Sequence, residues 1–198
     1  MALSSKKLQQ KRQKKKAKRQ IKIKERTSST LDYSTWSIHE CWVSAGLWET
    51  GMGQAVLARK SIFGDIAVGV YLIDSFCLGI KNCFVRVLDS QDFHDMLNTV
   101  EASCGEMKRV EPTYINTLIH RAIDYAKQFN FHPHKDFNKA KQLLRNILID
   151  ETLEFQFGND GKPCYVQGPN DSSSDTKRIL NTLKSTVGEG HYNYIVEV

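Results

Sequence analysis

The stretch that decides the fold is QAVLARKSIFGDIAVGVYLIDSF, residues Gln54–Phe76. Two apolar runs, Gln54–Lys60 and Ile66–Phe76, flank the short segment SIFGD. Runs rich in Val, Ile, Leu and Tyr on either side of a glycine-containing segment predict a β-hairpin. The longest uninterrupted apolar run, Ile66–Ile73, is far shorter than the roughly 20 residues that cross a bilayer. The hairpin is therefore expected to belong to a soluble domain.

Further strands are expected before and after this hairpin. They are Ile38–Ser44 and Lys81–Leu88, with a turn or short helix at Gly46–Gly53 between the first of them and the hairpin. Apolar residues at helical spacing, Pro112 at a helix start and the turn residues at 159–161 then indicate the remaining elements. These are helices at 90–102, 113–129, 136–148 and 172–188, a hairpin at 153–168 and a last strand at 191–198.

This order of elements indicates the fold class. Strands come first, helices in the middle and a hairpin late, which is typical of an α+β fold. We therefore expect a mainly antiparallel sheet with three to four helices packed on it, preceded by a disordered basic N-terminal arm. The predicted division is an arm over residues 1–30 and a single domain over residues 31–198.

The charges are distributed unevenly along the chain. Residues 1–26 carry twelve Lys and Arg against one acid, Glu25, which gives a net charge of +11. The whole chain has 28 bases and 22 acids, so the remainder has 16 bases and 21 acids and a net charge of −5. A segment with so few apolar residues and so much charge is expected to be disordered in isolation.

This arm is expected to contact a polyanion, with RNA or the ribosome favoured over DNA. Cations that neutralise phosphates release counterions, so such binding depends on charge and salt. The arm has no aromatic side chain to stack on bases, so it is not expected to read sequence. A targeting address, a contact with membrane anions and a solvated tail are the alternatives. The predicted contacts are Lys6, Lys7, Lys11, Arg12, Lys14, Lys15, Lys16, Lys18, Arg19, Lys22 and Lys24.

The cysteines and the N-terminus indicate the compartment. The chain has five cysteines, an odd number, and none are in C-x-x-C spacing. Reduced thiols of a cytoplasmic protein fit this pattern. The basic start is not followed by the apolar segment of a signal peptide, and no transmembrane segment is expected. Cys41 or Cys77, with His39 or a distant histidine, could form a thiolate–imidazolium pair, but no catalytic signature surrounds either cysteine.

One short motif indicates a metal site. In FHPHKDF, residues 131–137, the ligands would be His132, His134 and Asp136. This resembles the start of the H-x-H-x-D-H pattern of metallo-β-lactamase-fold hydrolases, which implies a divalent metal centre. Phe137 stands where that pattern has its last histidine. The alternative is a helix–helix connection in which Pro133 fixes the turn. No other cofactor is expected.

Two carboxylates lie within predicted strands and are candidate catalytic residues. Glu40 lies in HECW and Asp74 lies at the end of the hairpin's second strand. A carboxylate among apolar residues must be paired, hydrogen-bonded or metal-bound, so the two could bind Mg²⁺ in a nuclease. Alternatively, Asp74 ends its strand and accepts backbone N–H groups of the following turn. The segment Glu106–Lys108 has the E-x-K form of one nuclease superfamily, but it is expected to lie in a loop.

Four segments carry a family resemblance. They are HECWVSAGLWETGMGQ, YLIDSFCLGIKN, FHPHKDF and FQFGNDGKPCYVQGP. Together they resemble a group of uncharacterised bacterial proteins, and the likeness spans residues 38–190. It implies a bacterial protein but no activity. We expect a nucleic-acid-associated protein that docks through its arm. The alternatives are a metal-dependent hydrolase or nuclease, and a protein-interaction module or effector with a basic targeting tail.

Overall fold

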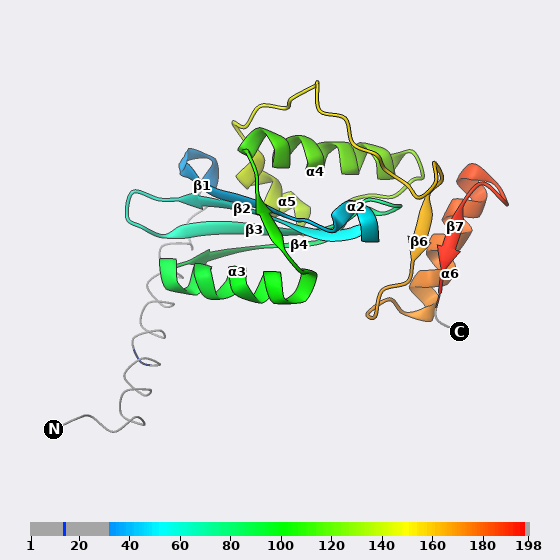
Figure 1. Ribbon diagram of the computed structural model, residues 1–198, viewed down its shortest axis with the longest axis horizontal. Coiled ribbons are helices and arrows are strands. Elements are labelled where there is room, and N and C mark those ends of the chain that lie inside the picture. The colour runs from blue at the N-terminus through cyan, green and yellow to red at the C-terminus, as the bar shows by residue number, and fades with distance from the viewer. Residues whose placement is uncertain (1–13, 15–31, 197–198) are drawn as a thin grey trace. The chain divides into compact units, whose positions relative to one another are not determined.

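The computed structural model describes Lys14 and residues 32–196 (Figure 1). The chain divides into two units, Met1–Tyr33 and Ser34–Val198, and the second is described below. Lys14 is exposed. The other predicted polyanion contacts, from Lys6 to Lys24, lie outside the described residues, as does the predicted boundary at residue 30. The disorder of the arm therefore stays a prediction.

Five antiparallel strands form the main sheet, in the order β4-β3-β2-β1-β5. The predicted hairpin is confirmed at its centre, where β2 (Met52–Lys60) pairs with β3 (Ile66–Asp74) in unbroken register. The flanking strands are β1 (Ser37–Ser44), which pairs with β2, and β4 (Gly79–Leu88), which pairs with β3. The short α2 (Leu47–Thr50) joins β1 to β2 where a turn or short helix was expected.

Helix α3 (Ser90–Cys104) covers one face of the sheet (Figure 1). Asp89 is its N-cap, with the Oδ1 atom accepting the backbone N–H of Asp92 at 2.9 Å. Phe93 of the helix packs with Val56 of β2 and Val68 of β3 in one buried apolar cluster.

Three helices lie on the opposite face: α4 (Pro112–Lys127), α5 (Phe137–Ala140) and the 3-10 helix η2 (Lys141–Leu144). The hydroxyl of Tyr71 in β3 donates to the carbonyl of Ala140 at 2.9 Å. Because helices cover both faces, β2 and β3 are buried along nearly their whole length. Strands buried on both faces are apolar at consecutive positions, as these two are.

Arg59 of β2 is a buried cation, 4% exposed, on the face covered by η2. Its guanidinium donates to four backbone carbonyl oxygens: from Nε to Leu143 at 2.8 Å, from Nη1 to Ser34 at 3.1 Å and Trp36 at 2.8 Å, and from Nη2 to Arg145 at 2.5 Å. These acceptors belong to the segment before β1 and to the end of η2. One side chain therefore holds two separate segments against the sheet.

A second, two-stranded sheet lies near the C-terminus. In it β6 (Cys164–Val166) and β7 (Asn193–Ile195) are parallel, and α6 (Ser173–Val187) connects them. Tyr165 of β6 and Leu183 of α6 share an apolar cluster with residues that follow α4. The backbone N–H of Cys164 donates to the carbonyl of Phe76, just after β3, at 3.0 Å. The β6–α6–β7 unit therefore packs on the end of the main sheet.

The α+β prediction is confirmed, with an antiparallel sheet and helices packed on it. The predicted hairpin at 153–168 is wrong, although its turn forms with Asp160 and Gly161 at φ 51° and 73°. Only Asn159 and Lys162 bridge across the turn, and β6 pairs with β7 instead. Phe155 and Phe157 before the turn pack on aromatic rings, including Trp48, rather than entering a sheet.

Two other local predictions are wrong. The helix expected at 136–148 ends at Leu144 as a short α-helix followed by a 3-10 turn. Arg145 is extended and Asn146 is left-handed at φ 61°, so the helix cannot continue. The Glu106–Lys108 segment, expected in a loop, contributes two residues to the edge strand β5 (Met107–Arg109).

Candidate functional site

The two candidate catalytic carboxylates lie far apart in the sheet. Glu40 in β1 is opposite Ala58 of β2, whereas Asp74 in β3 is opposite Met52 at the other end of β2. Ala58 and Met52 are six positions apart, which corresponds to about 20 Å along an extended strand. Glu40 and Asp74 therefore do not converge on one metal ion.

Glu40 lies beside a cleft of about 390 Å³ at the edge of the main sheet. Its Oε2 accepts the indole N–H of Trp42 at 3.0 Å, and its Oε1 is 4.0 Å from Nε2 of His39. The cleft opens because β5 pairs only with Trp42–Ser44 before the chain turns away into α4. The lining residues are Ile38, His39, Glu40, Cys41, Arg109, Val110, Glu111 and Pro112.

The electrostatics of the cleft favour binding of a small polar group over nucleophilic catalysis. Burial lowers the pKa of His39, and the nearby Glu40 only partly opposes this effect. Burial raises the pKa of Cys41 to about 12, so its thiol is protonated at neutral pH. A protonated thiol is a weak nucleophile. The cleft thus offers a neutral imidazole, a carboxylate and the guanidinium of Arg109.

The residues of the predicted metal motif occupy the loop before α5. His132 is exposed, and the backbone N–H of His134 donates to the carbonyl of Ile80 at 3.0 Å. Nδ1 of His134 accepts the backbone N–H of Asp136 at 3.3 Å and is 3.7 Å from its Oδ2. Among residues 32–196 no three His, Cys, Asp or Glu side chains are arranged to hold a metal ion. The contacts of this loop are those of a connection between helices.

Asp74 is the most deeply buried carboxylate in the described part of the chain, at 2% exposed. Its Oδ1 accepts the backbone N–H groups of Phe76 at 3.1 Å and Cys77 at 2.8 Å. Both residues lie in the turn at residues 75–78 that joins β3 to β4. Its Oδ2 is buried without a hydrogen-bond partner among the described residues. Burial raises the pKa of Asp74 to about 6, against the opposing effects of the backbone hydrogen bonds and of Lys81.

Asp74 is expected to make stability depend on pH. Because its pKa is raised above the ordinary 3.8, the folded chain holds this proton more tightly. The resulting stabilisation is complete below about pH 4 and is lost as pH rises through about 6. The side chain in Asp74→Asn cannot titrate. The free energy of unfolding of this variant minus that of the native chain should therefore increase by about 2 to 3 kcal/mol between pH 3.5 and pH 7. Urea unfolding at several pH values measures this, and a difference independent of pH would contradict it.

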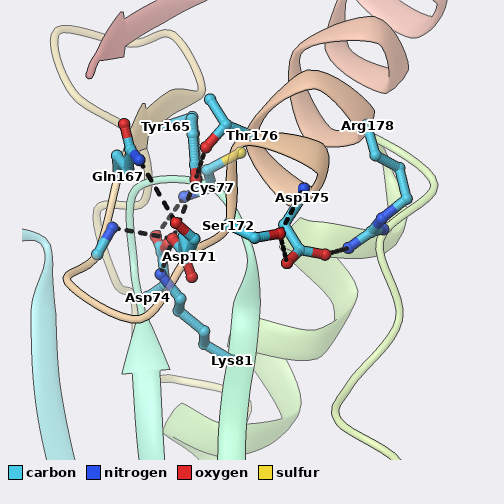
Figure 2. A network of polar contacts seen from close by, with 11 residues as sticks. Asp74, Cys77, Lys81, Tyr165, Gln167, Asp171, Ser172, Asp175, Thr176 and Arg178 are labelled. Atoms are coloured by element: carbon cyan, nitrogen blue, oxygen red, sulfur yellow. Dashed lines mark hydrogen bonds and ion pairs between the residues drawn. The ribbon is translucent and has the colours of Figure 1, made fainter. Parts of the chain in front are cut away.

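A second polar centre lies close by and was not predicted from the sequence. Figure 2 shows Lys81 of β4 and Tyr165 of β6 reaching the carboxylate of Asp171, in the loop before α6. Oδ2 of Asp171 accepts from Nζ of Lys81 at 2.6 Å, from the hydroxyl of Tyr165 at 3.0 Å and from the backbone N–H of Gly168 at 2.9 Å. Tyr165 also contacts the hydroxyl of Thr176 at 3.2 Å.

The ionisation states in this centre are set by burial and hydrogen bonding. Burial opposes the charge on Asp171, but the hydrogen bonds from Lys81, Gly168 and Tyr165 outweigh it and lower the pKa of the carboxyl. Burial raises the pKa of Tyr165 to about 12, so the phenol remains a donor. The centre is therefore a charged lysine–carboxylate pair that fastens the loop before α6 to β4.

The comparisons with known proteins add no functional assignment. No protein-family model, curated protein or solved structure matches this chain. Within the described residues, no helix has the length and apolar character needed to cross a membrane.

Proposed function

We propose that this protein binds a polyanion, RNA or the ribosome in preference to DNA, through its N-terminal basic residues. The observation that carries the proposal is the charge distribution, +11 over residues 1–26 and −5 over the rest of the chain. A negatively charged body is repelled by phosphates, so the basic residues should supply the affinity. Segments of this composition occur on ribosome-associated and nucleic-acid-binding proteins, and also as localisation or lipid-surface signals. The proposed place of action is therefore the cytoplasm.

The fold of the body is consistent with this assignment. Proteins that bind single strands on a sheet stack bases on its exposed aromatic residues. Here both faces of the main sheet are covered by helices (Figure 1). Tyr71 is fully buried, and Trp42 packs against the cluster beneath α3. Among the aromatic side chains of the described main sheet only Phe84, on the edge strand β4, is exposed. One ring at the edge is a small stacking surface, which supports placing the contact on the basic segment.

The proposal is tested by the salt dependence of binding. The full chain is titrated with a generic single-stranded RNA and with a DNA duplex at several salt concentrations. If half of the twelve cations contact phosphates, log K against log salt should have a slope of roughly −4 to −5. A full-length variant with six of the lysines replaced by glutamine should have about half that slope. A chain that starts at Leu31 should lose the salt-dependent binding.

Lysines outside the basic segment provide the matched control. Lys108, Lys135 and Lys139 are exposed, and replacing them by glutamine removes charge without touching the N-terminus. These replacements should leave the slope unchanged. If the chain from Leu31 binds as tightly as the full chain, the proposal is wrong and the binding surface lies on the body. Stronger binding to DNA than to RNA would overturn the stated preference.

A further inference from the structure

Strand β4 leaves a long edge of the main sheet open. It is the outermost strand, and it pairs with β3 on one side only. Near its start, the carbonyl of Ile80 accepts the N–H of His134. From Asn82 to Leu88, no backbone group bonds to another described segment on the open side. An open edge of this kind can pair with another strand.

The composition of this edge protects it little. Open strands usually avoid pairing through proline, bulges, charged side chains or inward-facing charges. The segment Asn82–Leu88, sequence NCFVRVL, has no proline, glycine or acidic residue, and Arg86 is its one charged residue. Its pairing with β3 is regular, and the one irregularity in β3–β4 lies at Lys81, just before this segment. The segment is therefore straight enough to accept a partner strand over seven residues.

The exposed side chains of the edge are complementary to each other. Phe84 is 37% exposed, and the guanidinium carbon of Arg86 is 5.1 Å from the centre of its ring. The two are opposite Val70 and Val68 of β3, so both project toward the α3 face. A cation over an aromatic ring is a favourable contact. The edge thus carries a cation and its aromatic acceptor two residues apart.

We propose that two copies of this chain associate through their β4 edges, antiparallel and centred on Val85. This register places Phe84 of each copy opposite Arg86 of the other, so the cation–aromatic contact is made twice across the interface. A register centred on Arg86 would instead place two guanidinium groups opposite each other, which is unfavourable. The interface is isologous and closes after two copies. The two sheets become one continuous sheet of ten strands.

The register is tested by crosslinking the full chain under mild oxidation. Val85→Cys places two thiols directly opposite, at the Cα separation of antiparallel neighbours, which a disulfide spans. The matched control is Asn82→Cys, which faces Leu88 of the second copy rather than itself and leaves the Phe84–Arg86 contact in place. Asn82 is the more exposed position, so random collision would favour the control. We expect the Val85→Cys dimer to form at least about tenfold faster. Equal or slower crosslinking would overturn the proposal.

The association itself is measured by sedimentation over a range of protein concentrations. The native chain should show a monomer–dimer equilibrium, and Arg86→Ala should raise the dimer Kd about tenfold because it removes two symmetric contacts. Arg178→Ala makes the same charge change on exposed α6 and should leave the Kd unchanged. A native chain that stays monomeric, or equal effects of the two variants, would overturn the proposal. Circular dichroism establishes that each variant is folded.

Discussion

Replacement of Arg59 by alanine should lower the free energy of unfolding by about 3 to 5 kcal/mol. The guanidinium donates to four backbone carbonyl oxygens, two before β1 and two around the end of η2. Removing it leaves carbonyl groups without their donor in a poorly hydrated region. Each such group costs about 1 to 3 kcal/mol. Chemical denaturation followed by circular dichroism measures the loss.

Two variants separate this role from loss of charge. Arg59→Lys keeps the charge but lacks the planar fork of donors, so it should recover less than half of the loss. Arg109→Ala removes an exposed arginine from β5 of the same sheet and should change stability by less than about 1 kcal/mol. If Arg59→Lys were as stable as the native chain, charge alone would account for the effect and the four-carbonyl explanation would be wrong.

Replacement of Asp171 by asparagine should lower stability by about 3 kcal/mol and should loosen the β6–α6–β7 unit before the main sheet unfolds. The variant keeps the shape of the side chain but leaves the Lys81 ammonium without its counter-charge. Lys81 and Asp171 are 17% and 13% exposed, so solvent compensates this loss only in part. Hydrogen exchange measures the effect, with faster exchange expected in α6 and β6 than in β2 and β3.

The matched control is Asp175→Asn, in the first turn of α6. Asp175 is about half exposed, lies 3.5 Å from Arg178 and accepts the hydroxyl of Ser172 at 2.5 Å, a contact that asparagine can keep. The loss there should stay below about 1 kcal/mol.

The contribution of Asp171 to the free energy of unfolding should also disappear in acid. Because the pKa of Asp171 is lowered, its stabilisation is present above the ordinary pKa of 3.8 and is lost as pH falls through the folded value. Uniform faster exchange across the sheet would contradict the local role.

The functional residues were predictable to different degrees. The basic residues are evident from composition, but most lie outside the described residues, so their role stays a proposal. Glu40 was singled out because a carboxylate in an apolar strand is costly, and it does line the cleft. Arg109, also in the cleft, had no such signal. Asp171 was missed because it lies in a polar loop, and its partner Lys81 is 90 residues away. Local sequence patterns cannot identify a contact between residues that are so far apart in the sequence.

The β2–β3 hairpin, α3, α4 and α6 could be predicted from local patterns, because those patterns repeat over neighbouring residues. The partner of each short or ambiguous segment depends on tertiary contacts. LEFQF before the Asn159–Gly161 turn reads as a strand, but Phe155 and Phe157 gain more from packing on aromatic rings such as Trp48. β6 pairs with β7 because α6 brings them together. Local patterns fix backbone conformation, whereas strand partners and buried charge pairs depend on contacts between segments that are distant in the sequence.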